Sequence, residues 1–554
     1  MDRDIRIVVA IDFGTTFSGF AYANKVNPEI VTNDSWPEQT GVFKTNTVLQ
    51  YDENWNVTKW GYPALAQEPV KKLRKRDANN AHHAKPVELF KLYLASDAGG
   101  EMPPLPPGLD FKRAITDYLG EMAKLIKETL ASRWPGIRFP QQVRVVLTVP
   151  AEWTEEAKAV MRACAFHAGL IETLRSDLLE FTTEPEAAAI HCISILKEHE
   201  LMPGASFMIV DCGGGTVDLT TRRLLPDNQL GEITERSGEL CGSSFVDREF
   251  LKFLGRKLGF EAMNQLKTNH YGQLQYLVQQ FCTKVKFSFN GNPSEFRTKE
   301  LDIERVCPAV MQYMTEKAHA ELDDVDWIVE MTYDDVKKMF DPVVNKIITL
   351  IDRQLNASDT PCSCMFLVGG FGESQYLQAR VRATFGRLVP VIAVPKHPIA
   401  AVVRGALSYG LNMSTVKTRV LKWSYGVEVS ARWEPGDPPE RRTPQGRLFK
   451  FHQLARRGTE VAVNQKFQYT AGPVNPNQTD MNFNIYVTPA LTAKYCDENG
   501  MRMLGKMKID LPDPHLGKDR LIQFTLTFGA MEVKATAQNI RNGQIYQTTF
   551  DLEF

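Results

Sequence analysis

The sequence has no long hydrophobic run. None of its apolar stretches approaches the ~20 residues that a membrane-spanning helix needs. The first residues, MDRDIRIVVAIDF, contain only a short apolar run that ends at Asp12. They predict a first strand and not a secretory signal peptide. We therefore expect no membrane partner.

The sequence also lacks a large net charge and a regular pattern of paired cysteines. The formal net charge of the 554 residues is -1, and so neutral a field favours neither nucleic acid nor an anionic membrane as partner. The nine cysteines are scattered. Cys362 and Cys364 have no matching second pair, which argues against zinc and favours buried thiols in a reducing compartment. We expect a cytoplasmic protein, with the nucleus as the alternative address.

Two apolar strands each lead into a glycine-rich turn. The first strand, predicted over 5–11, continues through Asp12-Phe13-Gly14-Thr15-Thr16 into a second strand over 17–23. Far downstream, a strand over 207–210 leads into Asp211-Cys212-Gly213-Gly214-Gly215-Thr216. A duplicated unit that places two loops face to face would produce this repetition.

Each turn contains the residues that a phosphate group requires. Glycines let the main chain curl tightly and aim closely spaced N–H groups at one anion, and the threonine hydroxyls add donors. Asp12 and Asp211, at the strand ends, suit a magnesium ion, which keeps most of its waters and takes few carboxylates. A single turn of this kind is more often a simple loop. Two of them, each with a preceding aspartate, predict a nucleotide site with magnesium.

The other elements divide the chain into an α/β part and an all-β part. Ile115, Leu119, Met122 and Ile126 share one face of a helix predicted over 111–132. The elements predicted after it are a strand over 143–149, a helix between Thr154 and Gly169, helices over 245–254 and 273–287, and a strand over 365–368 that ends in Gly369-Gly370.

From Val427 onward, short alternating strands separated by turn signals are typical of an all-β unit. Asn499-Gly500 predicts a tight hairpin, because both central positions of such a turn need positive φ. No helical segment follows the last strand, so we expect no helical lid. The clearest of these strands are predicted over 483–487, 507–511, 524–528 and 550–554.

Several motifs together resemble the DnaK or seventy-kilodalton heat-shock protein family, within the actin and sugar-kinase superfamily. The matching segments, in family order over residues 1 to about 412, are IDFGTTFSGFAYA, VVLTVPAEWTEEAKAVMRACAFHAGL, TTEPEAAAI, IVDCGGGTVDLT, LCGSSFVDREF and FLVGGFGES. The segment FTLTFGAMEVKATAQNIRNGQ resembles the family's substrate-binding β-sandwich. CGSSFVDREF in place of the usual GGEDFD is similar to the divergent branch that includes the mammalian twelve-A and twelve-B members.

The resemblance implies an α/β fold, in which a two-lobed actin-like ATPase with duplicated RNase H-like units is followed by an all-β sandwich. The implied nucleotide-binding domain covers residues 1–412, with lobe I at about 1–198 plus 395–412 and lobe II at about 199–394. A linker over 413–422 then leads into a substrate-binding-like β-sandwich over 423–554.

The resemblance also assigns roles to single residues. Asp12 and Asp211 correspond to the family's magnesium-sphere aspartates. Glu184 corresponds to the glutamate that positions metal and water, and Lys91 to the lysine that orients the attacking water. The implied catalytic residues are Glu184, Lys91, Asp211 and Thr216. The implied nucleotide-binding residues are Gly14, Thr15, Thr16, Gly213, Gly214, Gly215, Thr216, Gly242, Lys284, Ser288, Gly369 and Gly370.

Some positions depart from the family pattern. Phe281 stands where the family has a glutamate on the ribose, and Val285 and Glu373 replace arginines. The basic residues Lys417 and Arg419 lie where the family has an acidic and apolar linker. These departures concern nucleotide affinity, purine choice and signalling between domains, and they leave the phosphate chemistry intact.

We therefore expect an ATP-binding, slowly ATP-hydrolysing chaperone-like protein that uses ATP/ADP and Mg²⁺. Its expected partners are a nucleotide and, through the β unit, a peptide or protein client. One alternative is a nucleotide-gated binding or scaffold protein with negligible turnover. Another is a sugar or acid kinase of the same superfamily, which would need a phosphoacceptor pocket and has no use for a terminal β unit.

Overall fold

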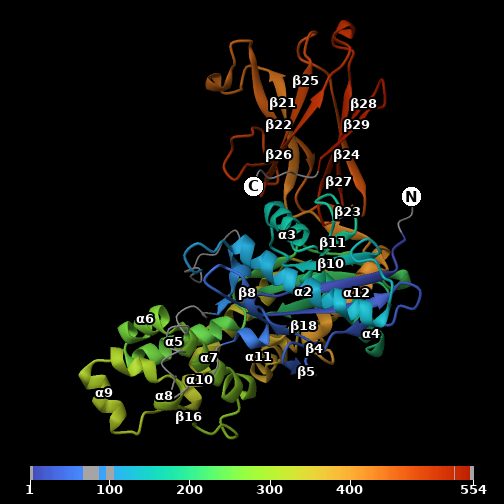
Figure 1. Ribbon diagram of the computed structural model, residues 1–554. Coiled ribbons are helices and arrows are strands. Elements are labelled where there is room, and N and C mark those ends of the chain that lie inside the picture. The colour runs from blue at the N-terminus through green and yellow to red at the C-terminus, as the bar shows by residue number, and fades with distance from the viewer. Residues whose placement is uncertain (1–3, 66–85, 95–104, 530, 549–554) are drawn as a thin grey trace. The chain divides into compact units, whose positions relative to one another are not determined.

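The computed structural model describes residues 4–65, 86–94, 105–529 and 531–548 (Figure 1). The strand predicted over 550–554 lies outside these residues. The chain forms two compact units. The first comprises residues 1–152, 163–220 and 237–413, and the second comprises residues 153–162, 221–236 and 414–554.

One sheet of the first unit carries the first glycine turn. Its strand order is β11-β10-β1-β2-β3, and β6 also pairs with β2. β1 is parallel to β10 and antiparallel to β2. All residues of β1 are buried, which explains its continuous apolar run. The bounds are β1 (Ile7–Phe13), β2 (Phe17–Asn24), β3 (Val31–Thr32), β6 (Thr45–Asn46), β10 (Val143–Val149) and β11 (Leu179–Thr183).

Another sheet carries the second glycine turn. Its strands in the first unit follow the order β13-β12-β18-β19, and β15 pairs with β13. β12 is parallel to β18. Each sheet thus has a central strand with a parallel neighbour on one side and, after a glycine turn, the next strand of the chain on the other. The bounds are β12 (Ser206–Cys212), β13 (Val217–Leu225), β15 (Ser237–Glu239), β18 (Cys364–Val368) and β19 (Val391–Ala393).

Three helices pack around the first sheet. The helix predicted over 111–132 is confirmed as α2 (Phe111–Arg133), and its four predicted apolar residues are buried. α12 (Ala401–Leu411) packs on β1 and against α4 (Glu184–Glu198) (Figure 1). Gly405 permits this approach, because a Cβ there would lie 1.7 Å from the carbonyl oxygen of Ala187. This packing fixes the start of α4.

The remaining helices of the first unit surround a second apolar core, which includes Phe250, Phe281 and Phe340. The helix predicted over 273–287 is too long, since α7 ends at Lys284. Val285 turns inward there with φ -124° and is buried in that core. The bounds are α5 (Ser244–Leu258), α6 (Phe260–Asn269), α7 (Tyr271–Lys284), α8 (Ile303–Val306), α9 (Glu316–Asp323), α10 (Tyr333–Asn356) and α11 (Gln375–Phe385).

Small sheets complete the first unit. They are β4-β5, β8-β7-β9 and β16-β17. Their bounds are β4 (Ser35–Trp36), β5 (Gln39–Thr40), β7 (Val48–Tyr51), β8 (Val57–Trp60), β9 (Val87–Glu88), β16 (Lys299–Asp302) and β17 (Ile328–Met331). α3 (Glu155–His167), whose residues 155–162 belong to the second unit, begins after Thr154, whose hydroxyl accepts from the N–H of Ala157 at 3.3 Å, and Gly169 follows its end with φ +76°.

The second unit contains two four-stranded sheets, β22-β21-β25-β26 and β24-β27-β28-β29. Their inner side chains form one buried cluster, in which Phe483 of β25 stacks on Phe524 of β27 with ring centroids 4.7 Å apart. The strands predicted over 483–487, 507–511 and 524–528 are found here. The bounds are β21 (Ser424–Arg432), β22 (Arg447–Ala455), β24 (Gln465–Ala471), β25 (Asp480–Thr488), β26 (Arg502–Asp510), β27 (Ile522–Phe528), β28 (Lys534–Asn539) and β29 (Ile545–Thr548).

The predicted hairpin at Asn499-Gly500 is wrong. Thr488 and Arg502 end and begin the flanking strands, so a long loop replaces a two-residue turn. Only Gly500 of the two central residues has positive φ. The loop is held instead by Glu498, whose Oε1 accepts from the N–H groups of Lys494 and Tyr495 at 2.8 Å each.

The segment predicted as a linker contains a strand of the second unit. β20 (Thr418–Val420) pairs antiparallel with β23 (Glu460–Ala462). The N–H of Val420 donates to Oε2 of Glu232 at 2.7 Å. Glu232 belongs to β14 (Gln229–Glu232), which pairs with residues 222–225. It also forms an ion pair of 3.1 Å with the fully buried Arg222.

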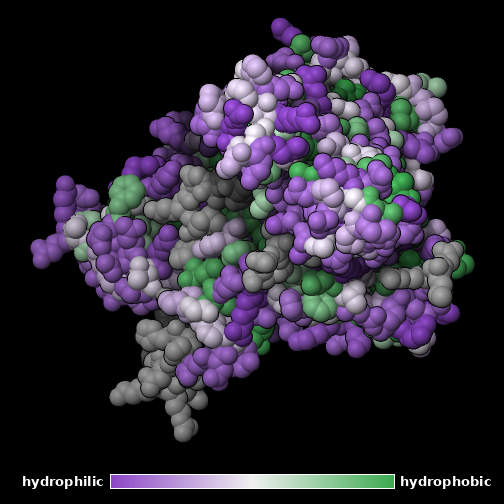
Figure 2. Space-filling view, turned by 90° about the horizontal axis from the view of Figure 1, so that it is seen from above, coloured by the Kyte–Doolittle hydropathy of each residue, from purple (hydrophilic) through white to green (hydrophobic). Residues whose placement is uncertain are grey.

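Within the part of the chain that the structure describes, no helix has the length and apolarity to cross a membrane. Hydrophilic residues predominate on the face shown in Figure 2, and hydrophobic residues lie among them in small groups.

Candidate functional site

The first glycine turn is held rigidly at the end of β1. The N–H of Gly14 donates to Oγ of Ser18 at 3.1 Å, and the hydroxyl of Thr47 donates to the carbonyl oxygen of Gly14 at 2.9 Å. A Cβ at Gly14 would lie 2.1 Å from the carbonyl oxygen of Phe17. Only glycine therefore fits this curl.

The second glycine turn is clasped by the chain that leads into α5. The N–H groups of Gly242, Ser243 and Ser244 donate to the carbonyl oxygens of residues 215, 213 and 214 at 3.1, 3.0 and 2.8 Å. A Cβ at Gly242 would lie 2.5 Å from the carbonyl oxygen of Gly214. With its carbonyls engaged beneath it, the turn keeps a fixed shape.

The two turns meet. A Cβ at Gly214 would lie 2.0 Å from Oγ1 of Thr16, and one at Gly215 would lie 2.8 Å from Oγ1 of Thr15. Two sheets thus present their glycine turns to each other, as the repetition in the sequence suggested. The two turns can approach this closely only because residues 214 and 215 are glycines, which have no Cβ.

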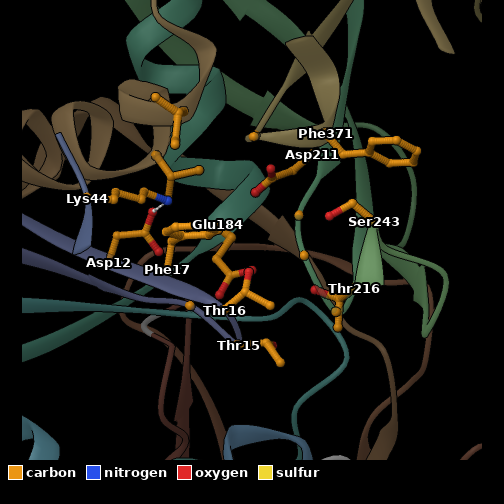
Figure 3. A pocket seen from close by; sticks show the side chains of 18 of the residues that line it. Asp12, Thr15, Thr16, Phe17, Lys44, Glu184, Asp211, Thr216, Ser243 and Phe371 are labelled. Carbon is orange, nitrogen blue, oxygen red and sulfur yellow. Dashed lines mark ion pairs between the residues drawn. The ribbon is translucent and has the colours of Figure 1, made fainter. Parts of the chain in front are cut away.

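A cavity of about 470 Å³ lies at this meeting point and has the size of small-molecule sites. Figure 3 shows Lys44, Asp12 and Glu184 on one side of it and Asp211, Thr216 and Ser243 on the other. Its lining residues are Asp12, Gly14, Thr15, Thr16, Phe17, Lys44, Lys91, Glu184, Asp211, Gly213, Gly214, Gly215, Thr216, Ser243, Lys286, Phe287, Gly369, Gly370, Phe371, Glu373, Ser374, Ile399 and Val402.

Two buried ion pairs lie in the cavity wall. Nζ of Lys44 is 2.6 Å from Oδ2 of Asp12, and Nζ of Lys91 is 2.6 Å from Oε1 of Glu184. Lys91 lies in the 3-10 helix Phe90–Leu94, and Glu184 is the first residue of α4. Because burial would penalise either charge alone, each pair holds its partners in place.

Negative charge is concentrated around Asp211. Burial, followed by the charges of Glu184 and Asp12, raises the pKa of Asp211 well above its usual range. Burial and the charge of Glu184 raise the pKa of Asp218 to about 7. Asp218 accepts a hydrogen bond of 2.8 Å from the N–H of Ala151. The sequence motifs gave Asp218 no role.

This donor set fits a hydrated magnesium ion. Asp12 and Asp211 are buried carboxylates on the cavity wall, and a hard cation would relieve the repulsion between them. Among the described residues, no three His, Cys, Asp or Glu side chains converge as direct ligands. The fit therefore requires the ion to keep most of its waters.

Most of the predicted site residues line this one cavity, and three do not. Gly242 lies beneath the second turn, while Lys284 and Ser288 are exposed near the end of α7. Because α7 ends early, the neighbours Lys286 and Phe287 line the cavity in their place. Gly369 has φ +78°, and a Cβ there would lie 2.4 Å from Oδ1 of Asp211.

The motifs missed Lys44, Phe17, Ser243, Phe371, Ser374 and Val402, along with the two neighbours just named. Phe371 and Ser374 directly follow the predicted Gly369-Gly370, so strand-end reasoning could have found them. Lys44 lies in a connection with no motif, and only the pairing of β6 with β2 brings it to the site.

Known proteins with similar sequences match nearly the whole chain. Human Heat shock 70 kDa protein 12A is 27% identical over 634 aligned residues, which cover 98% of this chain and 91% of the relative. Human Heat shock 70 kDa protein 12B is 26% identical with the same coverage. These heat shock 70 kDa proteins are homologues of the chain. Chaperone protein HscA of Buchnera aphidicola subsp. Baizongia pistaciae is 23% identical over 77% of this chain and 76% of its own length.

No protein-family model matches the chain. The heat-shock relationship confirms the resemblance to this family and to its twelve-A and twelve-B branch. Together with a mixed α/β fold of several sheets, which fits an actin-like ATPase, it supports a nucleotide-binding protein of the heat-shock 70 type.

Proposed function

We propose that this protein is an ATP-binding, slowly ATP-hydrolysing, chaperone-like member of the heat-shock 70 type. In this proposal, two RNase H-like units enclose the nucleotide, and the sheets of the second unit form a β-sandwich for a peptide or protein client. The observation that carries it is the meeting of two glycine turns over one cavity that Asp12, Glu184 and Asp211 line.

The two turns would bind the phosphates. Their N–H groups and the hydroxyls of Thr15, Thr16 and Thr216 supply donors around a small concave volume. Asp12 and Asp211 would hold magnesium through its waters, and the ion would offset phosphate charge. The apolar walls at Phe287, Phe371 and Ile399 suit the nucleoside.

Hydrolysis would be an in-line attack by a water molecule on the terminal phosphate. Glu184 accepts a hydrogen bond from this water, and Lys91 is fixed beside it by their ion pair of 2.6 Å. The N–H groups of the turns stabilise the negative charge that develops on the oxygens of the transferred phosphoryl group. No covalent enzyme intermediate is needed. Because the protein contributes mainly positioning, we expect slow turnover.

The test is phosphate release by the wild type and by Glu184→Gln. The variant should keep ATP binding, since its side chain has the same shape, and should release phosphate at least about tenfold more slowly. A variant that is as active as the wild type would show that Glu184 is not the carboxylate that positions the water.

A second candidate is a nucleotide-gated binding protein with negligible turnover. Phe281, at the position of the family's ribose-binding glutamate, stacks on Phe250 at 4.1 Å inside the core, and Glu373 lines the cavity where the family has an arginine. These two differences indicate that the contacts to the nucleoside differ from those of the family. ATP binding without phosphate release, with and without unfolded peptide, would support this candidate. ADP formation that requires a sugar, with the phosphoryl group transferred to that sugar and not released as free phosphate, would instead support a kinase.

A further inference from the structure

Lys44 reaches the cavity along a path that a glycine keeps open. It precedes β6, whose Thr45 pairs with Ser18 of β2. Its side chain crosses Gly19, where a Cβ would lie 2.9 Å from Cγ of Lys44. Gly19 is the β2 partner of Asp12 in the strand register. The missing side chain at Gly19 therefore lets the lysine extend to Asp12.

The ammonium group lies among acidic side chains. Its distance to Oδ2 of Asp12 is 2.6 Å, and the two side chains are only 10% and 4% exposed. The charges of Asp211 and Glu184 also act on it. Figure 3 shows Lys44 and Asp12 directed toward each other at the cavity. Burying an ammonium costs several kcal/mol unless it is compensated, so this is not an ordinary surface lysine.

The three buried carboxylates of the cavity differ in their partners. Asp12 is paired with Lys44 and Glu184 with Lys91. Within the described chain, Asp211 has no ion-pair partner. Two of the carboxylates thus each form an ion pair with a lysine of the protein.

We propose that Lys44 is a resident cation of the phosphate site, which lets the protein hold a nucleoside diphosphate with little dependence on a divalent ion. The inference rests on the proposed function. An ammonium has three donors, and the pair with Asp12 takes one, so donors remain for a phosphate in the cavity that Lys44 lines. The same pair neutralises Asp12, which would otherwise repel the phosphate. Of the two carboxylates proposed to hold hydrated magnesium, Asp211 is then the one that is not already paired with a lysine.

The experiment is calorimetric titration with ADP, once with magnesium and once with EDTA. For the wild type, the dissociation constant in EDTA should exceed that in magnesium by less than about tenfold. Lys44→Met should bind in EDTA at least about tenfold more weakly than the wild type, with magnesium restoring most of the affinity. Lys59→Met, the same change at an exposed lysine of the same unit, should match the wild type in both buffers.

A double variant separates a binding role from a structural one. Lys44→Met leaves Asp12 buried and unpaired and could unfold, whereas Asp12→Asn with Lys44→Met removes both charges. If the ammonium holds phosphate, the double variant also loses binding in EDTA. If Lys44 only neutralises the charge of Asp12, the double variant binds ADP in EDTA as the wild type does, and the proposal is overturned.

The outcomes distinguish the two proposals. Magnesium-dependent binding in which wild type and Lys44→Met respond equally to EDTA overturns the role of Lys44 alone. No heat from ADP in either buffer overturns the proposed function and the role of Lys44 with it.

Discussion

The buried ion pair between Lys91 and Glu184 predicts that substituting one partner alone destabilises the protein strongly, and more than substituting both. Both side chains are buried, with 4% and 11% exposure, and their charged atoms are 2.6 Å apart. Glu184→Gln keeps the shape of the side chain but leaves the ammonium of Lys91 without its counter-charge. Breaking a buried pair in this way costs about 3–5 kcal/mol, so we expect a loss of at least ~3 kcal/mol in the free energy of unfolding.

The assay is urea unfolding of nucleotide-free protein at neutral pH. The double variant Glu184→Gln with Lys91→Met should recover at least about 2 kcal/mol, because no uncompensated charge remains buried. Glu121→Gln is the control. Its ion pair with Lys124 is 2.5 Å long but largely exposed at the lysine, 69%, and should contribute less than about 1 kcal/mol. A loss below that value for Glu184→Gln, or a double variant no more stable than the single one, would refute the reasoning.

Three further expectations follow from other parts of the molecule. Gly369→Ala should destabilise the protein by at least about 1 kcal/mol, because its φ is +78° and a Cβ would strike Asp211. Gly120→Ala in α2, where a Cβ meets nothing within 4 Å, should be neutral or stabilising, and equal melting temperatures of the two variants would contradict this. Burial raises the pKa of Glu88 to about 7 from the ordinary 4.5. The contribution of Glu88 to the free energy of unfolding is therefore full below pH ~4.5 and is lost as pH rises through ~7. Glu88→Gln should make the melting temperature fall less over that pH range, and an equal fall in variant and wild type would contradict this. Fluorescent peptide should leave the β unit at rates that differ less than about tenfold between ATP and ADP, because the segment predicted as a linker carries the basic residues Lys417 and Arg419; a larger difference would show strong coupling.

Local chemistry made the centre of the site readable from the sequence. An apolar strand that ends in aspartate and glycine specifies both the turn and the position of the carboxylate, so Asp12, Asp211 and the two loops needed no tertiary information. Glu184 and Lys91 required the resemblance to a family, since neither belongs to a turn motif. Their ion pair is a product of packing, because α12 fixes the start of α4 through Gly405.

The parts that the sequence did not reveal depend on tertiary contacts. Lys44 gains its place only through the register of β6 with β2 and the gap above Gly19. The early end of α7 follows from burial of Val285 in the core, and helical periodicity does not register that burial. The long loop around Asn499 is stabilised by side-chain hydrogen bonds, which override the preference of Asn-Gly for a tight turn.

The central claim is that the two glycine turns bind nucleotide phosphates, and calorimetric titration of ATP with magnesium tests it most directly. Wild type should release or absorb heat on binding, and its melting temperature should rise with ATP, since a ligand at a hundredfold its dissociation constant stabilises the native state by about 2.7 kcal/mol. Gly214→Ala, whose methyl would lie 2.0 Å from Oγ1 of Thr16, should weaken binding at least about tenfold. No heat and no thermal shift at millimolar ATP, or equal affinity in the variant, would contradict the account.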